Sequence, residues 1–84
     1  MALRVISGDQ AIRAFIRAGW ARDRQVGSHV ILVKPNQPAV LSAPLHRELA
    51  PGTLRSLIGA AGMSVTEFQD LLQLLLPGFE MMTD

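Results

Sequence analysis

Apolar residues at helical spacing mark the first element of the chain. Between residues 8 and 18 the apolar positions lie three and four residues apart, at Ala11, Ile12, Phe15 and Ile16. Ser7 and Gln10 have the spacing of a capping box, and Gly19 supplies a helix stop. The pattern therefore predicts a first helix over residues 8–18.

The middle of the chain changes to short runs separated by turns. Residues 20–25 alternate loosely, residues 29–34 are mostly β-branched and aliphatic, and residues 39–43 form a third short apolar run. Gly27-Ser28 separates the first two runs, and the segment 35–38, with a proline at each end, separates the second and third. Three runs joined by turns predict an antiparallel, three-stranded meander.

Two further helices are predicted after a loop over residues 44–50. Pro51 stands at the start of the first, which runs to Gly62 and buries Leu54, Leu57, Ile58 and Ala61. Ser64 and Glu67 form a second capping box, which predicts a third helix with the apolar stripe Phe68, Leu71, Leu72 and Leu75. Several apolar residues lie off this stripe and predict a partner surface: Leu74, Leu76, Phe79, Met81 and Met82.

The order of these elements predicts an α+β fold. It resembles the double-stranded-RNA-binding fold, α-β-β-β-α, with an additional carboxy-terminal helix. A chain of 84 residues has room for one small domain, which we place at residues 1–76, followed by a tail over residues 77–84.

Composition excludes several classes of protein. A hydrophobic content of 49% argues against disorder, and the absence of cysteine excludes disulfides, a thiolate nucleophile and a cysteine zinc site. The two histidines and the scattered carboxylates show no metal-ligand spacing, so we expect neither a metal nor a cofactor. No apolar run is long enough for a signal peptide or a membrane span, so we expect a cytoplasmic protein.

Charge is distributed unevenly along the chain. Residues 1–55 hold all eight basic residues against three acidic ones, a net charge of +5, whereas residues 56–84 hold four acidic residues, a net charge of −4. Seven of the eight basic residues are arginine, which suits bidentate contacts to phosphate. A solvated charged face explains the same pattern equally well, so charge alone leaves anion binding open.

Two short motifs carry more specific information: Gly27-Ser28-His29, and the segment 48–55 with the sequence ELAPGTLR. Together with Ser7-Gly8, Gly19 and Pro44-Leu45-His46, they resemble the HicA toxin family over residues 6–76. This family consists of small messenger-RNA interferases of bacterial toxin–antitoxin pairs. The resemblance implies a metal-independent endoribonuclease with His29 as the catalytic residue, mRNA as the substrate, and a HicB-type antitoxin that neutralises it. A second copy of the chain, held through the apolar carboxy-terminal helix and tail, is a further expected partner.

The residues themselves fit this chemistry. Cleavage of RNA without a metal uses the 2′-hydroxyl as nucleophile, and an imidazole can remove its proton or protonate the departing 5′-oxygen. Gly27 would let a phosphate approach the backbone, and Ser28 could donate a hydrogen bond to it. Arg22 and Arg24, on the neighbouring strand, would stabilise charge that builds on the phosphorus. Further RNA contacts are predicted at Arg13, Arg17, Lys34, His46, Arg47, Thr53 and Arg55.

Simpler interpretations of the same residues stay open. A lone histidine at the start of an apolar strand is more often a structural residue with one nitrogen bonded to backbone, and His46 suits an ordinary surface position. The chain contains one lysine, fewer than we expect of the family, which weakens charge-driven RNA binding. Two alternatives to an enzyme therefore remain, a non-catalytic double-stranded-RNA-binding-like module and a protein-interaction domain.

Overall fold

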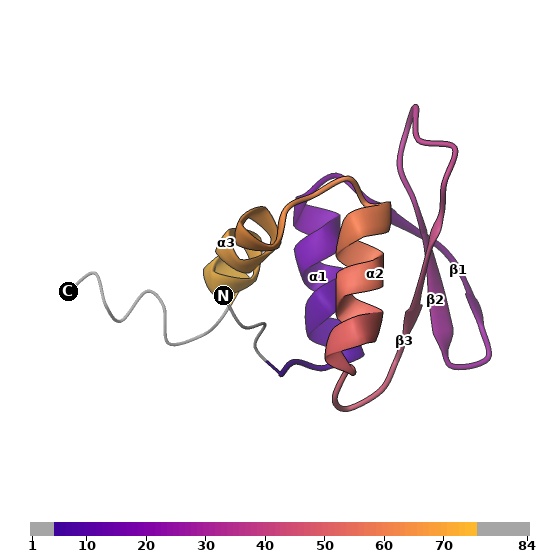
Figure 1. Cartoon of the computed structure of the whole chain (residues 1–84). Coiled ribbons are helices and arrows are strands. Elements are labelled where there is room, and N and C mark those ends of the chain that lie inside the picture. The colour runs from indigo at the N-terminus through magenta and orange to yellow at the C-terminus, as the bar shows by residue number, and fades with distance from the viewer. Residues whose placement is uncertain (1–4, 76–84) are drawn as a thin grey trace.

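A three-stranded antiparallel sheet and three helices form three layers (Figure 1). The computed structural model describes the backbone of residues 5–75 and the side chains of residues 5–73. Its elements follow the order α1 (Gly8–Arg17), β1 (Ala21–Val26), β2 (His29–Val33), β3 (Leu41–Pro44), α2 (Pro51–Ala60) and α3 (Val65–Leu75). Helices α1 and α2 lie side by side against one face of the sheet, and α3 packs on their far side. The predicted α+β fold, double-stranded-RNA-binding-like with an additional helix, is confirmed.

Both predicted capping boxes are present. At α1, Gln10 N donates to Ser7 Oγ at 3.1 Å, and Ser7 N donates to Gln10 Oε1 at 3.0 Å. Before α3, Glu67 N donates to Ser64 Oγ at 3.1 Å, and Ser64 N donates to Glu67 Oε1 at 2.8 Å. These bonds satisfy amide groups that a helix start leaves without partners. Both helices therefore begin where the sequence predicts.

The strand boundaries differ from the predicted ones at the two sheet edges. The first strand begins at Ala21 rather than residue 20, because the Trp20 amide donates to Phe15 O at 3.1 Å and so belongs to the end of α1; its side chain, 2% exposed, lies in the core. The third strand begins at Leu41 rather than residue 39, and Val40 stays 55% exposed. The register pairs Leu41 with Leu32, so apolar side chains face the helices on both strands.

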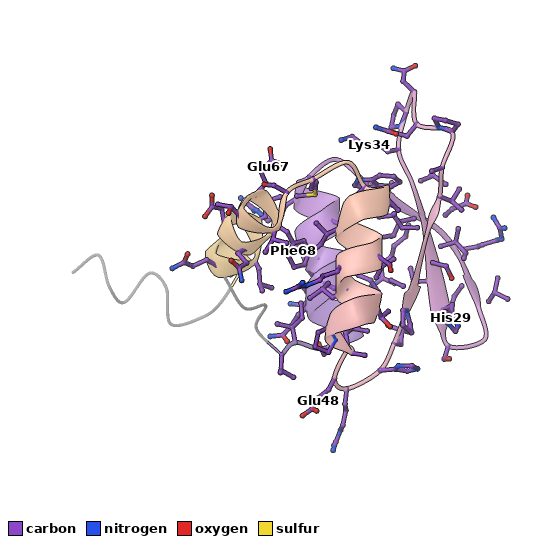
Figure 2. The ribbon with its side chains drawn as sticks, viewed as in Figure 1. His29, Lys34, Glu48, Glu67 and Phe68 are labelled. Carbon is purple, nitrogen blue, oxygen red and sulfur yellow. The ribbon has the colours of Figure 1, made fainter. Side chains whose placement is uncertain are left out.

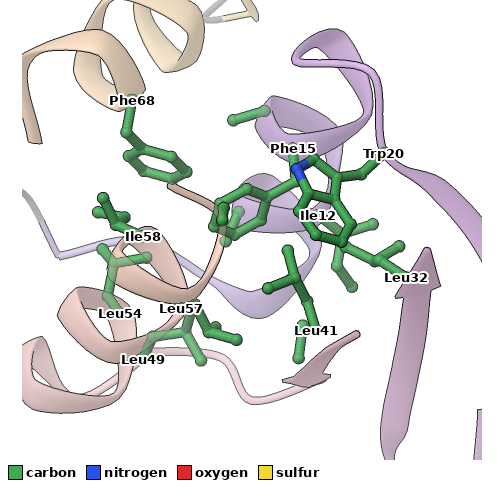
Figure 3. Close-up of a cluster of buried hydrophobic side chains, with 14 of the residues drawn as sticks. Ile12, Phe15, Trp20, Leu32, Leu41, Leu49, Leu54, Leu57, Ile58 and Phe68 are labelled. Atoms are coloured by element: carbon green, nitrogen blue, oxygen red, sulfur yellow. The ribbon is translucent and has the colours of Figure 1, made fainter. Parts of the chain in front are cut away.

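The core lies between the sheet and α1 and α2, and it continues between these two helices and α3 (Figure 3). Its larger side chains are Ile12, Phe15, Trp20, Leu32, Leu41, Leu49, Leu54, Leu57, Ile58 and Phe68. The rings of Phe15 on α1 and Phe68 on α3 have centroids 5.0 Å apart and planes inclined at 46°. This pair fixes α3 to the rest of the domain.

The predicted stripe of α3 is confirmed at Phe68 and Leu72, which are buried, and Leu71 is half-buried. The predicted tail over residues 77–84 and the side chains of residues 74–76 lie outside the described part. The domain limits and the homodimer through these residues therefore stay predictions. Among residues 5–75, no helix is long and apolar enough to cross a membrane.

Candidate active site

His29 lies at the start of β2, directly after the tight turn that joins it to β1. The turn is Gly27-Ser28, and Gly27 has φ of 59°, a conformation that glycine adopts without a steric cost. Gln25 Nε2 donates to Gly27 O at 3.0 Å across the turn. The predicted turn is therefore present, and it sets the histidine at the end of the sheet (Figure 2).

His29 is exposed and pairs with Val26 on β1 and with Pro44 on β3. Leu45 N donates to Ser28 O at 2.7 Å, which makes His29 and Pro44 a non-hydrogen-bonded pair, the kind in which facing side chains lie closest. Val30, the next residue, belongs to the core, so His29 lies on the sheet face opposite the helices. Within the described residues, no hydrogen bond or ion pair holds its imidazole. The structural interpretation of this histidine, with a nitrogen bonded to backbone, has no support here.

The loop between β3 and α2 lies at the same end of the molecule. His46 O accepts a hydrogen bond from Gly8 N at 2.8 Å, and Leu49 N donates to Ile6 O at 2.8 Å. These bonds tie the loop to the chain segment that enters α1. The side chains of His46 and Arg47 are exposed, and both α1 and α2 begin at this end (Figure 1). A turn, a loop and two helix starts thus surround the histidine end of the sheet.

The two arginines of β1 lie on opposite faces of the sheet. Arg24 pairs with Ile31, on the face of His29, and forms an ion pair with Asp23 at 2.5 Å between Nη1 and Oδ2. Arg22 pairs with Leu32, a core residue on the helix side, and its Nη2 lies 3.9 Å from Oδ1 of Asp9 on α1. A β-bulge between the two arginines breaks the alternation that would have put them on one face. The structure therefore brings Arg24, and not Arg22, to the face of His29.

The remaining predicted RNA contacts divide between the two ends of the domain. Arg13, in the middle of α1, forms an ion pair with Asp9 at 3.0 Å. Arg55 is exposed in α2, five residues into the helix that begins at the histidine end. Arg17 is the last residue of α1, at the opposite end. Lys34 also lies away from His29, with Nζ 6.0 Å from the centroid of the Trp20 ring (Figure 2).

Three of the arginines form exposed ion pairs, which leave them available to a phosphate. The Arg13, Arg22 and Arg24 side chains are 66%, 49% and 63% exposed in their pairs. Exposed ion pairs stabilise a protein by only about 0–1 kcal/mol, so a phosphate can compete with these carboxylates. Arg47 forms no ion pair within the described residues. The arrangement suits binding of an anionic chain.

One pocket among the described residues lies apart from His29. A pocket of about 510 Å³ lies at the other end, lined by Lys34, Met63, Glu67, Asp70 and Leu71 among others. In the part of the chain that the structure covers, no group of three or more His, Cys, Asp or Glu side chains is placed to hold a metal ion. The candidate site is therefore an open surface around His29.

A model of the HicA toxin family, described as the HicA toxin of bacterial toxin–antitoxin pairs, matches residues 8–63. The chain belongs to the HicA toxin family. The match begins at α1, includes the Gly27-Ser28-His29 turn and the loop 45–50, and ends just before α3. No curated protein matches the chain in a sequence comparison. HicA membership assigns the chain a toxin role, with a cognate antitoxin as its partner.

Two residues at the site were not predicted from the sequence. The sequence predicts Pro44 in a loop, whereas it ends β3 beside His29. In the sequence Gly8 is only part of a motif, whereas in the structure its amide holds the loop through His46 O. Both depend on strand register and on the packing of α1 against β3, for which the sequence has no local signal.

Proposed function

We propose that this HicA toxin is a metal-independent endoribonuclease that cleaves mRNA with His29 as its catalytic residue. The position of that side chain is the observation that carries the proposal. His29 is exposed beside a glycine turn, free of hydrogen bonds within the described residues, on the sheet face that also carries Arg24. A histidine with a purely structural role would be packed or hydrogen-bonded instead.

The chemistry follows from the imidazole and from the RNA. The 2′-hydroxyl oxygen attacks the adjacent phosphorus, and the bond from phosphorus to the 5′-oxygen breaks. The imidazole of His29 removes the 2′-hydroxyl proton or supplies a proton to the departing 5′-oxygen. The products are a 2′,3′-cyclic phosphate and a 5′-hydroxyl. His46, two residues after Pro44, the strand partner of His29, is proposed as an RNA contact.

The surroundings of His29 are suited to hold the RNA backbone. Nothing lies within 4 Å of the position that a Cβ on Gly27 would occupy, so a phosphate can approach the turn closely. Arg24 and Arg47 supply positive charge on this side. Helix α2 has no side-chain cap at Ala50, so the amides of Gly52 and Thr53 are free to donate to a phosphate, with Arg55 one turn further along.

The partner and the compartment follow from the same proposal. We propose a HicB-type protein as the antitoxin, bound over the histidine end so that RNA cannot reach His29. The substrate is mRNA, which places the activity in the cytoplasm. An antitoxin with an acidic surface would complement Arg24 and Arg47 at this end.

Cleavage of a long single-stranded RNA in excess EDTA tests the proposal. The purified chain is compared with His29→Ala and with His46→Ala as the matched control, since both histidines are exposed. We expect the parent to cleave, His29→Ala to lose at least about 100-fold in rate as removal of an acid–base group predicts, and His46→Ala to retain more activity. Product ends are mapped, and circular dichroism verifies that each variant is folded.

Two results would contradict the proposal. Equal cleavage by the parent and by His29→Ala would show that another group, or a contaminant, acts. Absence of cleavage by the folded parent, together with salt-dependent RNA binding, would favour the non-catalytic RNA-binding module instead.

A further inference from the structure

Gly8, the first residue of α1, lies against the end of β3 more closely than any other residue type could. A Cβ built on Gly8 would lie 1.9 Å from Pro44 O, 2.9 Å from Pro44 C and 3.1 Å from Leu45 Cα. All three neighbours are backbone atoms, which cannot rotate out of the way. Real Cβ contacts essentially never fall under 3.0 Å, so a side chain here would force Pro44 O and residue 8 apart by about 1.1 Å.

Conformation does not explain the glycine at this position. Gly8 is not among the glycines with positive φ, which are Gly19, Gly27 and Gly62. Alanine is the better helix former, so the helix itself would favour it at residue 8. What requires glycine is the close approach of two backbones, which is reinforced by the hydrogen bond from Gly8 N to His46 O at 2.8 Å.

The atoms that Gly8 touches are the ones that hold the His29 turn. Pro44 is the strand partner of His29, and Leu45 N donates to Ser28 O at 2.7 Å. A displacement of Pro44 and Leu45 is therefore transmitted to Ser28 and His29 through one residue pair and one hydrogen bond. We propose that Gly8 is a positioning residue: because it has no side chain, α1 packs directly against the end of β3, and this contact fixes the backbone that carries the imidazole of His29.

The expected effect of a Gly8 substitution on catalysis rests on the proposed function, whereas its expected effect on the position of His29 does not. A displacement of about 1 Å at a catalytic group can lower a rate about 100-fold. Arg24 lies on β1, which Gly8 does not touch, so the RNA contact that it supplies is kept and binding of RNA should change less than the rate. Gly8→Ala is therefore expected to lower kcat about 10- to 100-fold and to leave KM for RNA within about three-fold.

The experiment compares Gly8→Ala with Gly59→Ala, which makes the same change in α2 at a position with open space around the new Cβ. Two readouts are used on the whole chain, kcat and KM for RNA cleavage and the NMR signals of the Ser28 and His29 amides and of the His29 ring. We expect Gly8→Ala to shift these signals and to lower kcat, and Gly59→Ala to do neither. Unchanged signals with parental kcat in a folded Gly8→Ala variant overturn the proposal.

The NMR readout separates this inference from the proposed function. If the parent does not cleave RNA, shifted Ser28 and His29 signals still establish the positioning role, and unshifted signals refute it. If Gly8→Ala does not fold, hydrogen exchange of the backbone amides is measured in the parent protein and tests the positioning role instead. The amides of Gly8 and Leu45 should then lose their protection against exchange together. Exchange at Gly8 while Leu45 stays protected would refute the proposed coupling between α1 and the end of β3.

Discussion

Phe68 offers a direct test of whether α3 is an integral part of the domain. This helix lies beyond the residues that the HicA family model matches, yet Phe68 is 0% exposed and its ring contacts Phe15 on α1. The substitution Phe68→Ala removes this ring from the third layer of the fold. It leaves the sheet and the His29 turn untouched, because α3 lies on the side of α1 and α2 away from the sheet (Figure 1).

The expected loss is large compared with the total stability. A buried Phe→Ala change costs about 3–5 kcal/mol, from lost burial and from the cavity left behind. A domain of this length has a free energy of unfolding of roughly 4–13 kcal/mol at about 0.05–0.15 kcal/mol per residue. The contact between the two rings contributes about 0.5–1.5 kcal/mol of that loss beyond buried area.

Urea unfolding followed by circular dichroism measures the effect. We expect the unfolding midpoint to fall by at least about 1 M with little change in the m-value. Gln73→Ala, an exposed change on the same helix, is the control and should stay within about 0.5 kcal/mol of the parent. A double-mutant cycle with Phe15→Leu isolates the ring pair. A loss under about 1 kcal/mol, no larger than that of the control, would show that α3 is not packed on α1 as described.

Three further predictions follow from the local geometry. Ser64→Ala removes the cap of α3 and should lower the free energy of unfolding by about 0.5–2 kcal/mol in the same urea assay. Gly27→Ala, at φ of 59°, should lower the free energy of unfolding by about 1–2 kcal/mol. Gly59→Ala, within a helix and with open space around the new Cβ, should raise it by roughly 0.5–1 kcal/mol, and equal effects of the two changes would contradict the turn geometry. Arg47→Gln should reduce the slope of log affinity for single-stranded RNA against log salt by about 0.7, and Lys34→Gln at the far end should leave it unchanged.

The helix starts could be predicted because they depend on residues within one turn of each other. Ser7 with Gln10 and Ser64 with Glu67 each form the predicted reciprocal pair of hydrogen bonds. Such bonds form whatever the rest of the chain does, so sequence spacing is enough to find them. The Gly27-Ser28 turn belongs to the same class, since a two-residue hairpin is a local structure.

The strand ends and the arginine positions could not be predicted, because distant contacts decide them. Trp20 lies outside the first strand because its amide is bonded to Phe15 O of α1, and Leu41 starts the third because it pairs with Leu32. The hypothesis that Arg22 and Arg24 both flank His29 rests on the hairpin that sets the two strands side by side, and a regular strand would put residues two apart on one face. The β-bulge between the two arginines puts Arg22 on the opposite face instead, and nothing in the local sequence predicts this bulge.

Part of the uneven charge of the sequence lies on different layers of the fold, which bears on the proposed binding of RNA. Glu67 and Asp70 lie on α3, the layer farthest from the sheet, whereas Arg24 is on the sheet face with His29 (Figure 2). With a net charge of only +1, the molecule as a whole attracts a polyanion weakly. If the chain binds RNA as proposed, this placement of charge would direct the RNA toward the sheet side more than it would raise the affinity. The proposed catalytic residue, His29, lies on that side, and its exposed side chain needs no rearrangement of the core to reach a phosphate.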